Sequence, residues 1–248
     1  MNDSERFDFF KKHIALLERA VHEFNRALPQ PEFSATLKRF RYKNPTPLTF
    51  LVLKMSRIVA GLYAMLTLTK SGLFQDAGGV CRVIYECIHD IEFIMDGLTK
   101  DSFPPDKQEV VDNFFKKEIS TPEAMLNTMS KSPTIPRKKI YPTVGRFLSP
   151  QNPDRPQRIV KVLEEVMSGY IHAAYSHIME MYEGISKTFK MSGAIGRISA
   201  WTNQIALITH SALNDFSILA RELNLSQLEV ELISARNELE YSDVYKSI

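Results

Sequence analysis

The stretch GLFQDAGGVCRVIYECIHDIEFIMDG, residues 72–97, decides the fold because it combines an apolar helical pattern with a row of charges. Arg82, Glu86 and Asp90 follow one another at four-residue spacing, which places them on one face of a helix. Apolar residues occupy much of the remaining helix surface, so we expect the charged row to lie against other parts of the protein. Buried charges need partners, and the row therefore predicts either a functional site or a structural lock.

Helical periodicity continues over most of the chain, which has 248 residues and a hydrophobic content of 44%. Further helices are predicted over residues 4–28, 47–71, 106–118, 121–131, 158–189 and 194–224, and from Ser226 onward, with a kink near Gly169. Alternating strand patterns are missing. The sequence therefore predicts an all-α fold, a single compact helical bundle in which residues 1–248 form one domain.

Residues 132–157 interrupt the helical pattern. This stretch contains prolines at positions 133, 136, 142, 150, 153 and 156. Proline lacks a backbone donor and clashes with the preceding helical turn, so we predict a basic, proline-rich loop or arm outside the bundle. The helical halves on either side have apolar faces too wide for isolated hairpins and are expected to pack together.

Basic residues collect in two segments, one before residue 76 and one in the proline-rich stretch. The candidate nucleic-acid-binding residues are Lys38, Arg39, Arg41, Arg137, Lys138 and Lys139. Phe40, Tyr42 and Tyr141 lie among these cations, where aromatic rings could stack on unpaired bases. If the two segments converge, they form a face suited to RNA; the alternative is two solvated basic loops.

Two histidines are candidates for proton transfer. His89 follows Arg82 by seven positions and returns to nearly the same helix face. A cation beside an imidazole suits metal-independent RNA cleavage, with the ribose 2′-hydroxyl as nucleophile. His172 could reach Glu86 or Arg82 if its helix packs against residues 76–97. The candidate catalytic residues are thus Arg82, Glu86, His89 and His172; alternatively, the histidines are packing residues and Arg82 pairs with Glu86.

Gly72, Ala77, Arg82 and Glu86 form the pattern G-x4-A-x4-R-x3-E, and Gly169-Tyr-Ile-His172 follows later. Over about residues 50–185 the chain resembles a group of uncharacterised bacterial all-helical proteins that is similar to the HEPN clan. That clan includes abortive-infection proteins, toxin RNases and nucleotidyltransferase partners. The resemblance implies an intracellular helical bundle, often dimeric, with Arg82 and His89 or His172 as its site.

Other classes of protein are disfavoured. Glu86 and His89 form a single E-x-x-H element, whereas a di-iron bundle needs a second copy and two further glutamates, so no metal or cofactor is predicted. Phosphate-binding glycine loops and G-x-S-x-G elbows are also missing. Lys54 and Arg57 interrupt the most apolar stretch, which favours a core helix over a membrane span.

The compartment follows from the cysteines and the N-terminus. Cys81 and Cys87 lie about 9 Å apart along one predicted helix, too far for a disulfide. Both thiols are expected to be small buried side chains, and this role and a charged start without an export signal favour the cytoplasm. The working prediction is an RNase or RNA-binding toxin or antiphage-defence protein. The alternative is a non-catalytic interaction module with a buried polar lock.

Overall fold

The computed structural model describes residues 2–35, 38–98, 102–116, 136–194, 197–242 and 245. Its helices are α1 (Asp3–Arg26), α2 (Pro47–Lys70), α3 (Phe74–Leu98), α4 (Pro105–Lys116), α6 (Arg137–Leu148), α7 (Asp154–Ile171), α8 (Tyr175–Met179), α9 (Ile198–Glu222) and α10 (Ser226–Glu240). Two short antiparallel hairpins pair β1 (Glu32–Ser34) with β2 (Arg39–Arg41) and β3 (Tyr182–Glu183) with β4 (Thr188–Phe189). The all-α prediction is confirmed. The helix predicted over 121–131 lies outside the described residues.

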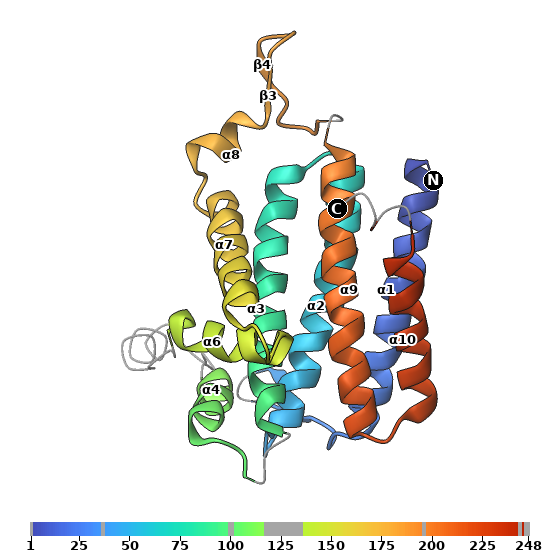
Figure 1. Cartoon of the computed structure of the whole chain (residues 1–248), viewed down its shortest axis with the longest axis vertical. Helices are drawn as coiled ribbons and strands as arrows, with labels where there is room; N and C mark the ends of the chain where they lie inside the picture. Colours follow the sequence, from blue (N-terminus) through green and yellow to red (C-terminus); the bar gives the residue numbers. More distant parts are fainter. Residues whose placement is uncertain are drawn as a thin grey trace.

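The long helices stand side by side with α2, α3 and α9 at the centre (Figure 1). α1 and α10 pack on one side of this group, against α9 and each other, while α6 and α7 pack on α3 at the other side. One continuous apolar core joins these helices and includes Phe24, Met65, Ile88, Met167 and Phe216. Burial of this core supplies the main driving force for the fold.

α2 begins and ends where its sequence predicts. The Thr46 hydroxyl accepts a hydrogen bond from the Thr49 backbone N–H, and Pro47 occupies the first helical turn. At its other end Gly72 has a φ of +72°, and the Leu73 N–H donates to the Leu68 carbonyl, which closes a Schellman motif. α2 is long and apolar enough to cross a membrane, but it packs among α1, α3 and α9, as core helices of soluble proteins do.

Replacing Gly72 with alanine is expected to lower the free energy of unfolding by at least about 1–2 kcal/mol. Only glycine adopts this left-handed conformation without strain, and an added Cβ would also overlap the backbone of Ala194. Gly79→Ala is the matched control, because its Cβ would enter open space within α3 and should add about 0.5–1 kcal/mol of stability. Urea unfolding of both variants measures the difference; equal effects would contradict the prediction.

The predicted loop over 132–157 is wrong for residues 137–148, which form α6, and for residues 154–157, which begin α7; residues 132–135 lie outside the described residues. Pro136 precedes the helix, where a missing N–H costs nothing, and only Pro142 lies inside it. α6 is not an arm outside the bundle: Ile140 and Val144 are buried against its neighbours. Burial of this face outweighs the cost of one internal proline. Pro153 and Pro156 likewise occupy the start of α7.

The helix predicted over 158–189 is also shorter than expected. α7 ends at Ile171, and Ala173 has a φ of +50°, which turns the chain into α8 and the β3–β4 hairpin above the bundle (Figure 1). The His177 ring lies where a side chain at position 169 would be, so Gly169 allows α8 to fold back onto α7. α1 begins slightly before its predicted start at residue 4, because Asn2 caps it: the side chains of Asn2 and Glu5 form a reciprocal capping box.

Candidate functional site: a polar cluster between α3, α6 and α7

Charged and polar side chains from four helices meet on the α7 side of α3, and we call this group the polar cluster. It consists of Lys54, Arg82, Glu86, His89, Asp90, Arg137, Tyr141, Glu164 and Ser168. The charged row predicted on the third helix is thus one wall of the cluster. Its burial is confirmed for Arg82 and Asp90, whose side chains are each 12% exposed, whereas Glu86 is 37% exposed.

Glu164 of α7 lies at the centre of the polar cluster and is 2% exposed. Its Oε1 accepts a hydrogen bond from His89 Nδ1 at 2.8 Å, and its Oε2 accepts one from the Tyr141 hydroxyl at 2.7 Å. Burial alone would raise the pKa of Glu164, but these two hydrogen bonds and the charges of His89 and Arg137 lower it to about 2. The carboxylate is therefore ionised and connects α7 to α3 and α6.

Arg82 connects α3 to α7 next to this carboxylate. Its Nε donates to Ser168 Oγ at 3.0 Å, while Nη2 lies 3.4 Å from Glu164 Oε2. Nη1 forms an ion pair with Glu86 Oε1 at 2.7 Å, within the same helix. All three nitrogens of the guanidinium group thus face oxygens of the chain itself.

Asp90 joins α3 to α2 and α6 at the other end of the row. Lys54 Nζ lies 2.8 Å from its Oδ2, and Arg137 Nη1 lies 2.6 Å from its Oδ1. Arg137 Nη2 also lies 3.7 Å from Glu86 Oε1. Burial alone would lower the pKa of Arg137, but Asp90, Glu164 and Glu86 raise it above its usual value. Arg137 was predicted to contact nucleic acid and instead points into the protein.

The structure leaves His172 outside the polar cluster. It is the exposed C-cap of α7, one turn beyond Ser168, whose carbonyl accepts the His172 backbone N–H. The expected approach of His172 to Arg82 or Glu86 is wrong, because α7 ends at Ile171 and the residue that contacts Arg82 is Ser168, one turn earlier. Of the four candidate catalytic residues, Arg82, Glu86 and His89 lie together and His172 does not.

The chemistry open to the polar cluster is limited by its charge balance and burial. Three cations, Lys54, Arg82 and Arg137, face three carboxylates, so an incoming phosphate would have to displace a carboxylate from its cation. His89 is 3% exposed and uses Nδ1 to hold Glu164, so it has no direct access to a bound substrate. The arrangement fixes α2, α3, α6 and α7 to one another, which is what a structural lock requires.

Sequence reasoning missed Glu164, Tyr141, Ser168 and Lys54. A signal for Glu164 was present, because it follows Val160 by four residues and precedes Met167 by three, on the buried stripe of α7. A carboxylate in an apolar stripe predicts a buried partner. Tyr141 could not be placed in the same way, since its segment was predicted to be a loop.

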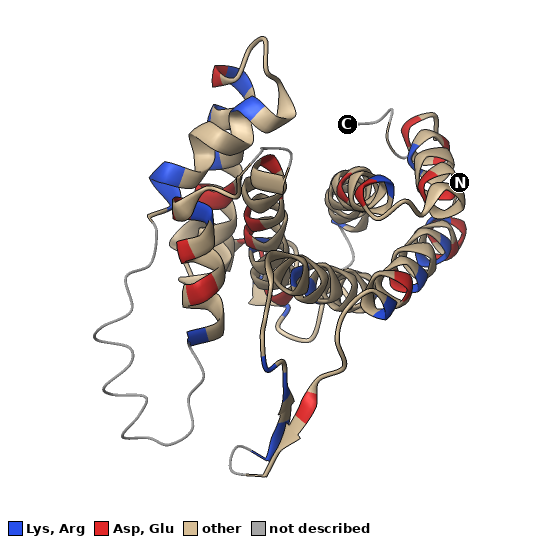
Figure 2. Cartoon of the chain, turned by 90° about the horizontal axis from the view of Figure 1, so that it is seen from below, with Lys and Arg blue, Asp and Glu red and all other residues tan. Residues whose placement is uncertain are grey.

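A second candidate surface is the β1–β2 hairpin, which projects from the helices as two arrows with basic residues along β2 (Figure 2). Lys38, Arg39 and Arg41 are all exposed on it. Phe33 and Phe40 are 59% and 67% exposed, and their rings meet edge to face at 5.3 Å. Beside them is a cavity of about 290 Å³, lined by Arg39, Phe40, Arg41, Tyr42, Pro45, Leu53, Phe114 and Phe115.

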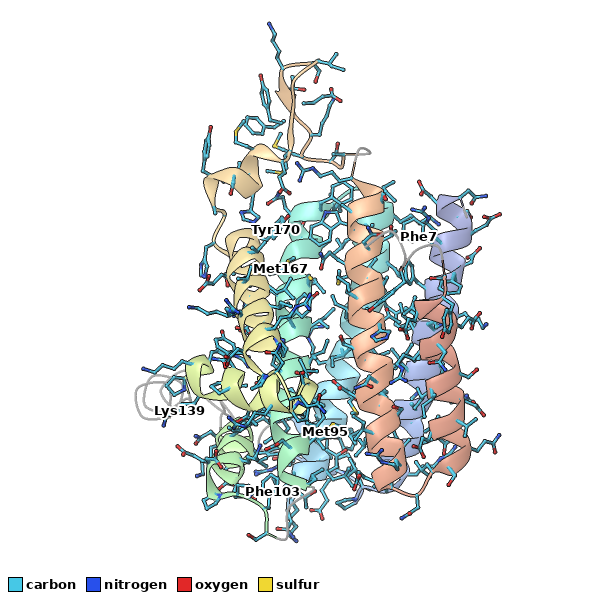
Figure 3. All side chains as sticks on the ribbon, viewed as in Figure 1. Phe7, Met95, Phe103, Lys139, Met167 and Tyr170 are labelled. Atoms are coloured by element: carbon cyan, nitrogen blue, oxygen red, sulfur yellow. The ribbon has the colours of Figure 1, made fainter. Side chains whose placement is uncertain are left out.

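The remaining basic candidates lie on a different element. Lys138 and Lys139 are exposed on α6, and Figure 3 shows Lys139 at the outer edge of that helix. In the same view Met167 and Tyr170 lie on the side of α7 that faces α3. Because Arg137 is turned inward, the basic part of α6 presents fewer cations than the sequence predicts.

A pair of buried carboxyl groups lies in the core between α3 and α9. Glu92 and Asp215 are 2% and 1% exposed. Among the described residues, neither Asp215 oxygen nor Glu92 Oε2 has a hydrogen-bond partner. Burial raises the pKa of Asp215 to about 8, and burial and the charge of Asp215 raise that of Glu92. Asp215 therefore keeps its proton at neutral pH, and the raised pKa of Glu92 likewise favours its protonated form.

Comparison with protein-family models, curated proteins and solved structures finds no match to this chain. The resemblance to the HEPN clan therefore stays a prediction. Among the described residues, no group of three or more histidine, cysteine, aspartate or glutamate side chains could hold a metal ion. The fold and the two surfaces together define an all-helical protein with a polar cluster whose charges pair with one another and a separate basic and aromatic hairpin.

Proposed function

We propose that this protein is a helical RNA-binding module in which the β1–β2 hairpin contacts single-stranded RNA. The observation that carries the proposal is the pair of exposed phenylalanines, Phe33 and Phe40, on a hairpin that also bears Lys38, Arg39 and Arg41. Single-stranded nucleic acids bind to surfaces of this composition, because aromatic rings stack on bases while cations attract phosphates.

The cavity next to the hairpin supports the same proposal. Phe40 and Tyr42 line it from the hairpin side, and Phe114 and Phe115 line it from α4. Such a recess can accept an unstacked base while Arg39 and Arg41 remain at its edge. The cations also disfavour a second copy of the hairpin as occupant, since like charges would be brought together.

Catalysis at the polar cluster has less support than binding at the hairpin. A nuclease of the predicted kind needs Arg82 open to a phosphate and His89 open to a ribose hydroxyl. Both side chains instead bind Glu164 in the interior. We therefore infer that the polar cluster holds the helices in place, in agreement with the interaction-module alternative.

The double variant Phe33→Ala/Phe40→Ala is expected to bind single-stranded oligouridylate at least about fivefold more weakly than the native protein. A loss of this size corresponds to one base that no longer stacks on an aromatic ring. Fluorescence anisotropy of a labelled oligonucleotide measures the dissociation constant. Tyr241→Ala is the control, because it removes a ring that is 74% exposed but lies at the end of α10. A second control, Lys138→Ala/Lys139→Ala, removes two cations from α6.

Equal affinity of the native protein and the Phe33/Phe40 variant would reject the hairpin as the RNA-binding surface. The same mixtures are analysed by gel electrophoresis for cleavage. Cleavage that disappears in Arg82→Ala, with an unchanged melting temperature, would favour the nuclease over the binding module. We expect the RNA to stay intact with the native protein and with Arg82→Ala.

A further inference from the structure

α7 presents apolar residues on two faces, of which only one is covered. Val160, Leu163 and Met167 face the core. Ile159, Val162 and Val166 point outward and are 49%, 55% and 46% exposed. Their spacing of three and four residues makes them a continuous strip along the helix, which we call the outer stripe. A continuous apolar strip on the surface of a protein marks a site of interaction.

Exposed charges lie beside the outer stripe, among them Arg158 and Glu165, and Lys161 Nζ lies 3.8 Å from Glu165 Oε1 on the same helix. Arg158 precedes Val162 by four residues and Glu165 follows it by three. Successive residues of an α-helix are rotated by 100° about its axis. Viewed down α7, Arg158 and Glu165 therefore lie about 40–60° to one side of Val162. Ile159 and Val166 lie about 40–60° to its other side. Arg158 and Glu165 thus flank the same edge, about 10 Å apart along the helix axis.

We propose that the outer stripe binds the outer stripe of a second copy of this chain, with the two α7 helices antiparallel and a two-fold axis beside Val162. This axis places Arg158 next to the partner's Glu165 and repeats the pair on the other side of the axis. Ile159 then packs against the partner's Val166, and Val162 packs near its own copy. A surface with this pattern is complementary to itself, which an isologous dimer requires.

The same charges argue against other arrangements of the two helices. A parallel pair about a two-fold axis would place Arg158 beside the partner's Ile159 and Glu165 beside the partner's Val166, so neither charge would meet an opposite charge. The outer stripe also lies on α7, an element separate from the β1–β2 hairpin, so dimer formation and RNA binding are tested independently.

Cysteine cross-linking tests the position of the axis. Cys81 and Cys87 are both buried, and burial raises the pKa of the Cys81 thiol to about 12, so the native thiols react poorly. The variant Val162→Cys is expected to form a disulfide-linked dimer under mild oxidation. Ile185→Cys is the control, since residue 185 is 97% exposed in the turn of the β3–β4 hairpin and should stay monomeric.

Sedimentation equilibrium tests the interface itself. The native chain is expected to dimerise in the micromolar range, as small interfaces do, and Val162→Glu should raise the dissociation constant at least about tenfold. Arg158→Glu and Glu165→Arg should each weaken the dimer by roughly two- to fivefold, and the double variant should restore it. Circular dichroism melts confirm that these surface changes leave the fold intact.

The outcomes separate the proposal from its alternatives. A native chain that stays monomeric at every concentration overturns it, and the outer stripe then serves a different partner. A dimer that resists Val162→Glu, or equal cross-linking of the two cysteine variants, places the interface elsewhere and also overturns it. Failure of the charge swap to restore association rejects the antiparallel arrangement.

Discussion

Glu164→Ala is expected to lower the free energy of unfolding by about 3–5 kcal/mol at pH 7. The substitution removes the oxygens that bind His89 and Tyr141 and leaves Arg82 with one carboxylate partner fewer in the interior. Buried donors without acceptors each carry a desolvation cost, so the loss exceeds that of a surface ion pair. Guanidinium chloride unfolding of the native and variant proteins measures it.

Two neighbouring glutamates provide matched controls for this result. Glu165 is exposed on the next position of α7, and Glu86 belongs to the polar cluster but is 37% exposed. Their alanine variants are expected to lose no more than about 1 kcal/mol. If Glu164→Ala costs no more than Glu86→Ala, the polar cluster is open to solvent and is not a structural lock.

The pH dependence of stability provides a second readout of Glu164. Because its pKa is lowered from 4.5 to about 2 in the folded protein, the stabilisation is present above pH 4.5 and is lost as the pH falls through this range. The slope is about 1.4 kcal/mol per pH unit at most. Glu164→Gln cannot be protonated in this range and should show a correspondingly weaker loss in acid.

Local signals in the sequence were sufficient to predict the long helices and the charged row. α2 has its cap, its first-turn proline and its terminal glycine within the segment itself. The spacing of Arg82, Glu86 and Asp90 likewise fixes their common face whatever packs against them. These features depend on residues a few positions apart, which is why sequence reasoning reaches them.

The partners of the row could not be predicted because they come from distant segments. Glu164 follows His89 by 75 positions, and Arg137 follows Asp90 by 47. Their contacts exist because α7 and α6 each pack directly on α3, and the prolines of the α6 segment argued against a helix there. The end of α7 was missed for a related reason, since Ala173 turns the chain without a glycine or proline at that position.

Asp215→Asn is expected to stabilise the protein by about 2–4 kcal/mol at pH 7 and to remove part of the loss of stability as the pH rises from 3.8 to about 8. Asp215 keeps a proton in the folded state up to about pH 8, whereas the unfolded chain releases it near pH 3.8. The folded state therefore binds more protons between these values, and stability falls as the pH rises, by about 1.4 kcal/mol per unit. Asparagine has no proton to lose in this window.

Urea unfolding of the native protein and the variant between pH 5 and pH 8 measures the effect, with Asp8→Asn as the control on the exposed surface of α1. The control makes the same chemical change and should shift stability by no more than about 0.5 kcal/mol. A native protein whose stability does not fall over this range would mean that Glu92 and Asp215 are ionised and solvated. If Asp215→Asn raises the free energy of unfolding and Asp8→Asn does not, Asp215 is a buried acid. Such an acid must be protonated for α3 to pack against α9.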